Sequence, residues 1–247
     1  LDNGDSFTVI NSGTISSSHT GDAIGVGLED SSTLTNLTNN GTISGLSSGA
    51  DAYGIYTFNS TFTNLTNGDT IKAETTGGND AYGIYNTTTT IDDLTNTGTI
   101  SAESSDDDAY GIVNDRATIN GLTNSGTIKA VAADDIAYGI FNYIGGGTAP
   151  IITDLTNTGI ISAEAIGDDE AYGIYNDEGT ITNLTNSGTI KSVVADDSAY
   201  AIYNDDGTIT NLTNTGTISG EAGGDFGYGI YNDWGGTITN LTNTGTI

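Results

Sequence analysis

Clustered carboxylates are the side chains of this sequence best suited to chemistry. They stand directly before a recurring Tyr-Gly-Ile segment: Asp106, Asp107, Asp108, Asp134, Asp135, Asp168, Asp169, Asp196 and Asp197. If successive repeats stack as strands, these carboxylates form columns spaced by about 5 Å and repel by about 1 kcal/mol per pair. Calcium, which takes about six to eight oxygen ligands, would relieve that repulsion. We therefore predict calcium as a candidate cofactor at these residues, with a solvated acidic surface as the alternative.

Aromatic residues that follow the Tyr-Gly-Ile segment form a second candidate site. Tyr175, Tyr203 and Tyr231 occupy the same place in three repeats. A row of exposed rings would stack on sugar rings or on a neighbouring molecule, whereas buried rings would belong to the core. The sequence therefore predicts a binding surface at these tyrosines, with a purely structural role as the alternative.

The facing of this segment follows from the period of two in a strand. Tyr172 and Ile174 are two residues apart and should share a face. We predict that they point inward and that Ala171, Gly173 and Tyr175 point outward. The opposite facing also satisfies a period of two.

Other chemistry finds little support in the residue types. The chain has one histidine, His19, and no cysteine, which excludes a thiol nucleophile and the usual zinc sites. Its 4 Lys and Arg against 32 Asp and Glu give a net charge of −28, which excludes a nucleic-acid partner. No apolar run approaches the roughly 20 residues of a membrane span. We predict that the chain is not an enzyme, and a polysaccharide-active enzyme is the weakest alternative.

The elements that would position these residues are repeats. The Tyr-Gly-Ile segment and its variants begin at Ala23, Ala52, Ala81, Ala109, Ala137, Ala171, Ala199 and Gly227, so the spacing is 28 or 29 residues with one of 34. A second motif, such as Leu184 to Ile190, alternates apolar and polar residues as a half-buried strand does. Nothing has a helical period. Recurring Asn176 and Asn186 are predicted to form ladders from repeat to repeat.

Short strands at this period predict an all-β parallel β-helix, a β-solenoid of about eight coils of ~28 residues. A β-propeller needs about 40 residues per blade, and two coils of 14 residues per repeat is a weaker alternative. The segment between Ile190 and Ala199 is expected to protrude, since 28 residues is long for one compact coil. We divide the chain into residues 1–22, a partial coil or cap, and 23–247, one repeat array with an insertion at 143–150.

Repeats of the form Ile-Thr-Asn-Leu-Thr-Asn-Thr-Gly-Thr-Ile followed by Tyr-Gly-Ile resemble the passenger domains of bacterial autotransporters, the type V secreted surface proteins. The resemblance covers the chain from Val9 to Ile247. It implies a right-handed coil and a place outside the cell, either secreted or on the bacterial outer membrane.

These observations predict a non-enzymatic structural rod, a stalk, adhesin or fibre subunit of a matrix such as a biofilm. Exposed strand edges at the ends of a solenoid favour the protein itself as the partner, head to tail or side by side. The alternative is a binding module for glycans or host surfaces through the tyrosines. Ice binding through recurring Thr-x-Thr, as at Thr180 and Thr182, is a further alternative.

Overall fold

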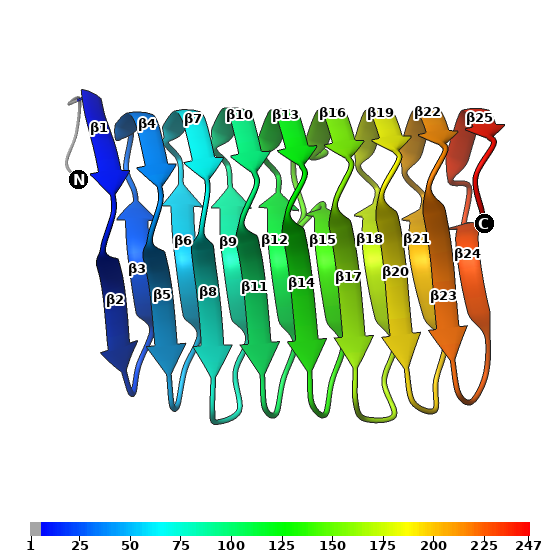
Figure 1. The fold of residues 1–247 in the computed structure, drawn as a ribbon, viewed down its shortest axis with the longest axis horizontal. Helices are drawn as coiled ribbons and strands as arrows, with labels where there is room; N and C mark the ends of the chain where they lie inside the picture. Colours follow the sequence, from blue (N-terminus) through cyan, green and yellow to red (C-terminus); the bar gives the residue numbers. More distant parts are fainter. Residues whose placement is uncertain (1–5) are drawn as a thin grey trace.

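The computed structural model describes residues 6–247 and contains strands but no helix in that range. Three parallel sheets run the length of a rod, and the chain visits them in turn (Figure 1). The first sheet contains β1 (Ser6–Asn11), β4 (Thr33–Asn39), β7 (Thr61–Asn67), β10 (Thr90–Asn96), β13 (Thr118–Asn124), β16 (Ile151–Asn157), β19 (Thr180–Asn186), β22 (Thr208–Asn214) and β25 (Thr237–Asn243).

The second sheet contains β2 (Thr14–His19), β5 (Thr42–Ser47), β8 (Thr70–Thr75), β11 (Thr99–Ser104), β14 (Thr127–Ala132), β17 (Ile160–Ala165), β20 (Thr189–Val194) and β23 (Thr217–Ala222). The third contains β3 (Ala23–Leu28), β6 (Ala52–Phe58), β9 (Ala81–Thr87), β12 (Ala109–Asp115), β15 (Ala137–Tyr143), β18 (Ala171–Asp177), β21 (Ala199–Asp205) and β24 (Gly227–Asp233).

Each repeat is one coil of three strands, which confirms the predicted β-solenoid of about eight coils. Residues at the same place in successive repeats pair directly, as Ile181 does with Ile209 and Leu184 with Leu212. The alternative of two coils per repeat is wrong, because every strand pairs with the strand one full repeat away. At about 4.8 Å per coil the rod is roughly 40 Å long.

The core has two compartments. Near the first sheet, large apolar side chains from all three sheets form one buried cluster. In one coil its members are Ile174, Ile181, Leu184 and Ile190, which are almost completely buried. Where the second and third sheets face each other, the buried side chains are mostly alanines. They are Ala52, Ala73, Ala81, Ala102, Ala109, Ala130, Ala132, Ala137, Ala163, Ala165, Ala171 and Ala199. The sheets therefore lie closest together in this second, alanine compartment.

This narrow compartment accounts for the long period of the repeat. Figure 1 shows the second and third sheets lying one in front of the other, joined by short bends at the lower edge of the rod. The segment between Ile190 and Ala199, which was expected to protrude, consists of β20 and one such bend. The extra residues thus extend the coil as two packed strands.

The predicted facing of the Tyr-Gly-Ile segment is wrong at three residues, Ala171, Tyr172 and Gly173. Ala171 points inward and is fully buried in the alanine compartment. Tyr172 belongs to an aromatic cluster on the outer side of the third sheet, together with Tyr175. Period two fails because the strand bends at Gly173, which is skipped in the pairing with β21. A side chain at Gly173 would meet Ile190, so Gly173 and Ile174 both face the interior.

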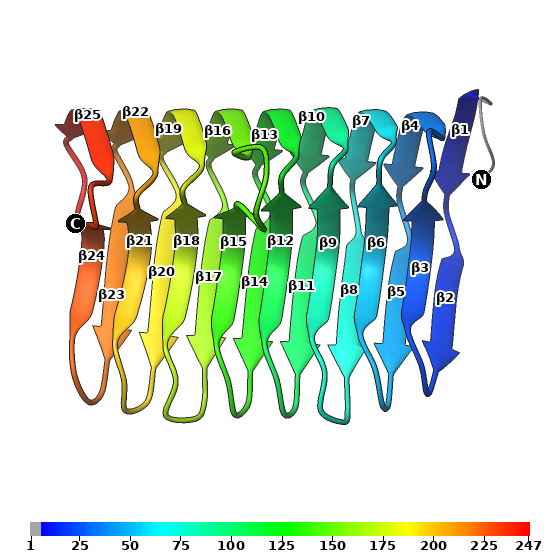
Figure 2. The same ribbon diagram turned by 180° about the vertical axis from the view of Figure 1, so that it is seen from behind.

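The N-terminal segment and the insertion depart little from this plan. Residues 6–19, part of the predicted partial coil or cap, form β1 and β2 and pair with β4 and β5, while residues 1–5 lie outside the described part. Most of the insertion at 143–150 forms a loop between β15 and β16, with positive φ at Gly146 and Gly147. Figure 2 shows this loop as an irregular segment in front of the upper part of the otherwise regular rod.

Two asparagine ladders are confirmed inside the coil. The amide of Asn157 donates to Oδ1 of Asn186 at 2.8 Å and to the carbonyl of Thr189 at 3.0 Å, and its Oδ1 accepts from Asn124 at 2.8 Å. A second ladder passes through Asn176 and Asn204 at 2.7 Å. These fully buried amides satisfy one another and the carbonyls of the turns.

Replacing Asn157 by alanine should lower the free energy of unfolding by about 3 kcal/mol, because two buried partners lose a hydrogen bond. Urea denaturation measures the change as a lower midpoint. Asn183→Ala is the matched control: Asn183 bonds Asp154 at 2.6 Å on the exposed side of the first sheet, and its loss should cost less than about 1 kcal/mol. Equal losses in both variants would contradict a structural role for the buried ladder.

Candidate functional site

The predicted acidic residues line the bends between the second and third sheets, one group per coil. Asp106, Asp134, Asp168 and Asp196 are exposed and form the outer column. Asp107, Asp135, Asp169 and Asp197 are half-buried and form the next column inward. Desolvation, together with the charges of Asp135 and Asp197 in adjacent coils, raises the pKa of Asp169. The expected columns of like charge are therefore present.

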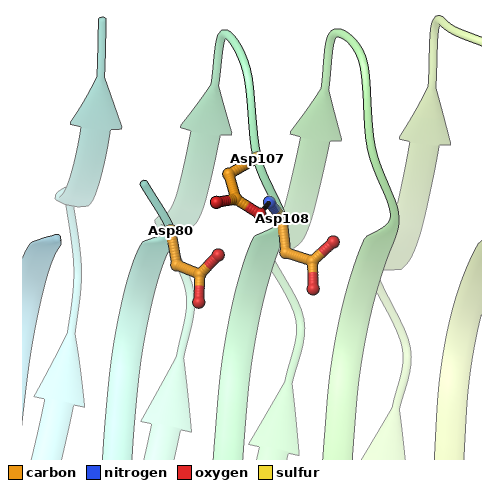
Figure 3. Close-up of side chains that lie close together, drawn as sticks. All are labelled: Asp80, Asp107 and Asp108. Atoms are coloured by element: carbon orange, nitrogen blue, oxygen red, sulfur yellow. Dashed lines mark hydrogen bonds between the residues drawn. The ribbon is translucent and has the colours of Figure 1, made fainter. Parts of the chain in front are cut away.

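One group of carboxylates is close enough to share a cation. Oxygen atoms of Asp80, Asp107 and Asp108 lie within 4.8 Å of one another, at the bends that lead into β9 and β12 (Figure 3). Carboxylate oxygens are the ligands that calcium prefers. Of the nine residues predicted from the sequence, this group includes only Asp107 and Asp108.

Asp80 is not predicted from the sequence because it is a single acidic residue, whereas the predicted columns are runs of acidic residues. The signal that identifies it is an acidic residue two positions before tyrosine. The hydroxyl of Tyr82 donates to Asp80 at 2.6 Å, and that of Tyr110 donates to Asp108 at 2.6 Å. The tyrosine thus holds the carboxylate at the edge of the third sheet.

The electrostatics of this group favour the protonated carboxyl. Desolvation by burial, reinforced by the charges of Asp80 and Asp135, raises the pKa of Asp108 to about 7. Desolvation and the charges of Asp107 and Asp51 raise the pKa of Asp80 to about 6. A bound cation would reverse this preference by stabilising the charged form.

The outer side of the third sheet carries two columns of aromatic rings. The first column contains the tyrosines of the Tyr-Gly-Ile segment, and Tyr110 stacks on Tyr138 with 4.8 Å between ring centroids and 1° between planes. The second column lies beside it, and Tyr172 contacts Tyr175 at 4.9 Å. We call these two columns the aromatic face. Neighbouring strands place the rings at the spacing of the coils, so the stack follows directly from the repeat.

The three predicted binding tyrosines all lie in the second column and are partly exposed. Tyr175 and Tyr203 are 4.8 Å apart, and Tyr203 and Tyr231 are 5.4 Å apart. The Tyr175 hydroxyl donates to Asp205 of the next coil at 3.1 Å. The structure thus places these rings side by side on one surface, as a surface for stacking requires.

The single histidine, His19, is the last residue of β2. Nδ1 of His19 accepts a hydrogen bond from the backbone N–H of Gly21 at 2.8 Å. The hollow beside it is lined by Ser18, Thr20, Leu46, Ser48, Glu74 and Thr76. Within the described part of the chain, no helix is long and apolar enough to cross a membrane.

Comparison with family models, with curated proteins and with solved structures gives no match to this chain. The functional argument therefore depends on the geometry of the rod and its surfaces.

Proposed function

We propose that this chain is a non-enzymatic structural rod that stacks head to tail, a stalk, adhesin or fibre subunit outside the bacterial cell. The observation that supports this role is the repetition of identical contacts from coil to coil. Each strand pairs in register with its counterpart, and like side chains stack on like along the whole described length. A solenoid of this kind is extended by any coil that repeats the same contacts.

The two ends of the first sheet carry matching apolar columns. At one end Phe7 and Val9 are only partly buried, although they begin the columns that continue as Leu34 and Leu37. At the other end Ile238 and Leu241 terminate the same columns, and Leu241 is 52% exposed. A second copy placed in register would stack its Phe7 on Ile238 and its Val9 on Leu241.

The asparagine ladder has the polarity that such a junction needs. Each amide donates toward the C-terminal end, as in the bond of 2.8 Å from Asn214 to Asn243. The Asn243 amide would donate in turn to Asn11 of the next copy. Unpaired strand edges, partly exposed apolar columns and the ladder thus all support end-to-end addition.

The proposed location outside the cell depends on the resemblance of the repeats to autotransporter passenger domains. The composition is compatible with it, because a net charge of −28 keeps a rod of exposed strands soluble. Coils held by hydrogen bonds and small-residue packing also need no disulfide, and the chain has no cysteine.

End-to-end stacking is tested by Leu241→Glu, which places a charge in the apolar column at the junction. We expect the parent chain to lengthen into filaments as its concentration rises, in electron micrographs and by light scattering, and the variant to stay monomeric. Thr242→Glu is the matched control: Thr242 is exposed in β25, next to Leu241 in sequence, and the charge added is the same. A parent chain that stays monomeric at every protein and calcium concentration would refute the proposal.

A glycan-binding module is the second candidate, and the partly exposed aromatic face supports it. Sugar rings stack on aromatic rings, and a row of tyrosines offers several such contacts along one chain of sugars. Glycan-array binding that is lost in Tyr175→Ala and Tyr203→Ala, with filament formation retained, would favour this function.

A further inference from the structure

The departures from the repeat concentrate on one part of the aromatic face. In the second column, Tyr85 pairs with Val113 and Val113 with Phe141, so one ring is missing from the row. Elsewhere in that column neighbouring rings are 4.8 to 5.8 Å apart. Tyr143, at the start of the insertion, stacks on Phe141 at 4.8 Å, where the two neighbouring coils have Asp115 and Asp177.

Beside Val113, whose side chain is only 2% exposed, lies a hollow of about 90 Å³. It is lined by Tyr82, Tyr85, Tyr110, Val113, Phe141 and Tyr143. Five of these six side chains are aromatic, and Val113 lies between the strands that carry Tyr85 and Phe141. A single flat ring entering the hollow would restore the column that Val113 interrupts.

Trp234 offers such a ring on the surface of the same protein. It is the only tryptophan and is 75% exposed. It stands at the corner after β24, with φ of 47°, where interior coils have Asn59, Thr88, Glu178 and Asp206. Those four residues are also exposed, whereas Arg116 at the same corner is partly buried and pairs with Asp115, so in most coils this position points away from the rod.

Charges beside the two features are complementary. Arg116, the only arginine, adjoins the hollow through Asp115, which it pairs at 2.7 Å and which accepts a hydrogen bond from Tyr85 at 3.4 Å. Trp234 follows Asp233 directly, and the backbone N–H of Trp234 donates to that carboxylate at 2.8 Å. In a chain of net charge −28, a basic group at the hollow and an acidic group at the tryptophan favour their meeting.

We propose that Trp234 of one rod inserts into the hollow beside Val113 of a second copy and joins the rods side by side. Trp234 cannot reach the hollow of its own chain, because four coil spacings separate β24 from β12 in the sheet. The contact joins two different surfaces, so each rod gives one and receives one, and the assembly stays open. This lateral contact deepens the proposed role as an assembling rod and uses no residue of the end-to-end junction.

Two variants test the two sides of the contact, the hollow beside Val113 and the Trp234 side chain. Val113→Tyr fills the hollow with the aromatic residue that the column carries in other coils, and Trp234→Asp gives the corner the residue found at Asp206. Both changes restore the repeat, so both variants should fold. To test for pairing, we would mix them in about 0.3 M salt, which screens the repulsion between acidic rods.

The single tryptophan reports the result directly. Each variant alone should show no lateral association. A mixture should associate side by side, with the two variants in equal amounts in the sedimented material and tryptophan emission shifted to shorter wavelength. The parent chain should show the same shift as its concentration rises. Emission that is independent of concentration in the parent chain, or association that persists in either variant alone, would overturn the proposal.

End-to-end stacking is measured in the same samples as the length of the filaments. Filament length should be unchanged in Val113→Tyr and Trp234→Asp, so loss of the lateral contact and failure of the end junction are distinguishable. If Val113→Tyr instead abolishes binding on a glycan array while tryptophan emission stays constant, the hollow takes a sugar ring and the lateral contact is wrong.

Discussion

Replacing Ala130 by leucine should lower the free energy of unfolding by about 3 kcal/mol, at the upper end of the usual cost of overpacking. Ala130 is fully buried in β14, where the second sheet faces the third. The residues that pair with it on either side, Ala102 and Ala163, are equally buried. A larger side chain must therefore push the two sheets apart along several coils.

The close approach of these sheets is evident where glycine replaces alanine in the same column. A side chain added at Gly45 would collide with the carbonyl oxygens of Ala23 and Tyr53 in the third sheet. Backbone atoms cannot move aside as a flexible side chain does, so the collision cannot be relieved by a local rearrangement. Denaturant titration of Ala130→Leu should show a lower midpoint, and hydrogen exchange should show the loss centred on β14 and its neighbours.

Two matched variants decide whether the narrow layer is the cause. Val131→Leu adds bulk to the other side of β14, where Val131 is partly exposed, and should change stability by less than about 0.5 kcal/mol. Ser192 belongs to the same column as Ala130 and buries a hydroxyl with no hydrogen-bond partner. Ser192→Ala should therefore stabilise the rod by about 1 kcal/mol. Equal losses in Ala130→Leu and Val131→Leu would contradict this account.

Repetition explains how much of the fold the sequence predicts. Because Ile181, Leu184 and Asn186 recur at one period, the number of coils, the inward columns and the ladders follow without knowledge of the coil's shape. Side chains in a solenoid meet their own counterparts, so one repeat predicts the contacts of the others.

The cross-section of the coil is harder to predict from the repeat than the number of coils. A period of two assigns faces correctly only along an uninterrupted strand, and Gly173 bends the strand between Tyr172 and Ile174. The alanine compartment is likewise invisible until Ala171 is placed inward, opposite the second sheet. One wrong facing therefore hid both the narrow layer and the first aromatic column.

The candidate sites show the same limit. Acidic runs predicted the columns at the bends, but the tightest group needed Asp80, which comes from a preceding coil. The hollow beside Val113 required the spatial row of rings, since a valine in an aromatic column is unremarkable when read along the chain. Sites formed between coils become visible only once the register is known.

The rod should be more stable at pH 5 than at pH 8, with a difference of about 5 °C in melting temperature. Asp108 and Asp80 have pKa values of about 7 and about 6, above the ordinary value of 3.8. The folded form therefore holds more protons than the unfolded form between about pH 4 and pH 7. This stabilisation is complete below about pH 4 and is lost as pH rises through the raised values. The groups are partly exposed, so we expect about 2 kcal/mol in total rather than the full effect of the shifts.

Calcium is expected to oppose this loss, because carboxylate ligands for calcium must be charged, and high pH creates the charged form. Adding calcium at pH 8 should raise the melting temperature, and adding it at pH 5 should have a smaller effect. Asp108→Asn should flatten the pH dependence and remove the calcium response.

Asp177→Asn is the control: desolvation and the charge of Asp205 raise the pKa of Asp177 to about 6, but Asp177 lies at the other end of its strand from the acidic bends. It should reduce the pH dependence and leave the calcium response intact. If calcium at pH 8 changes nothing while the pH dependence holds, the acidic bends are a solvated surface whose charges the fold tolerates by protonation.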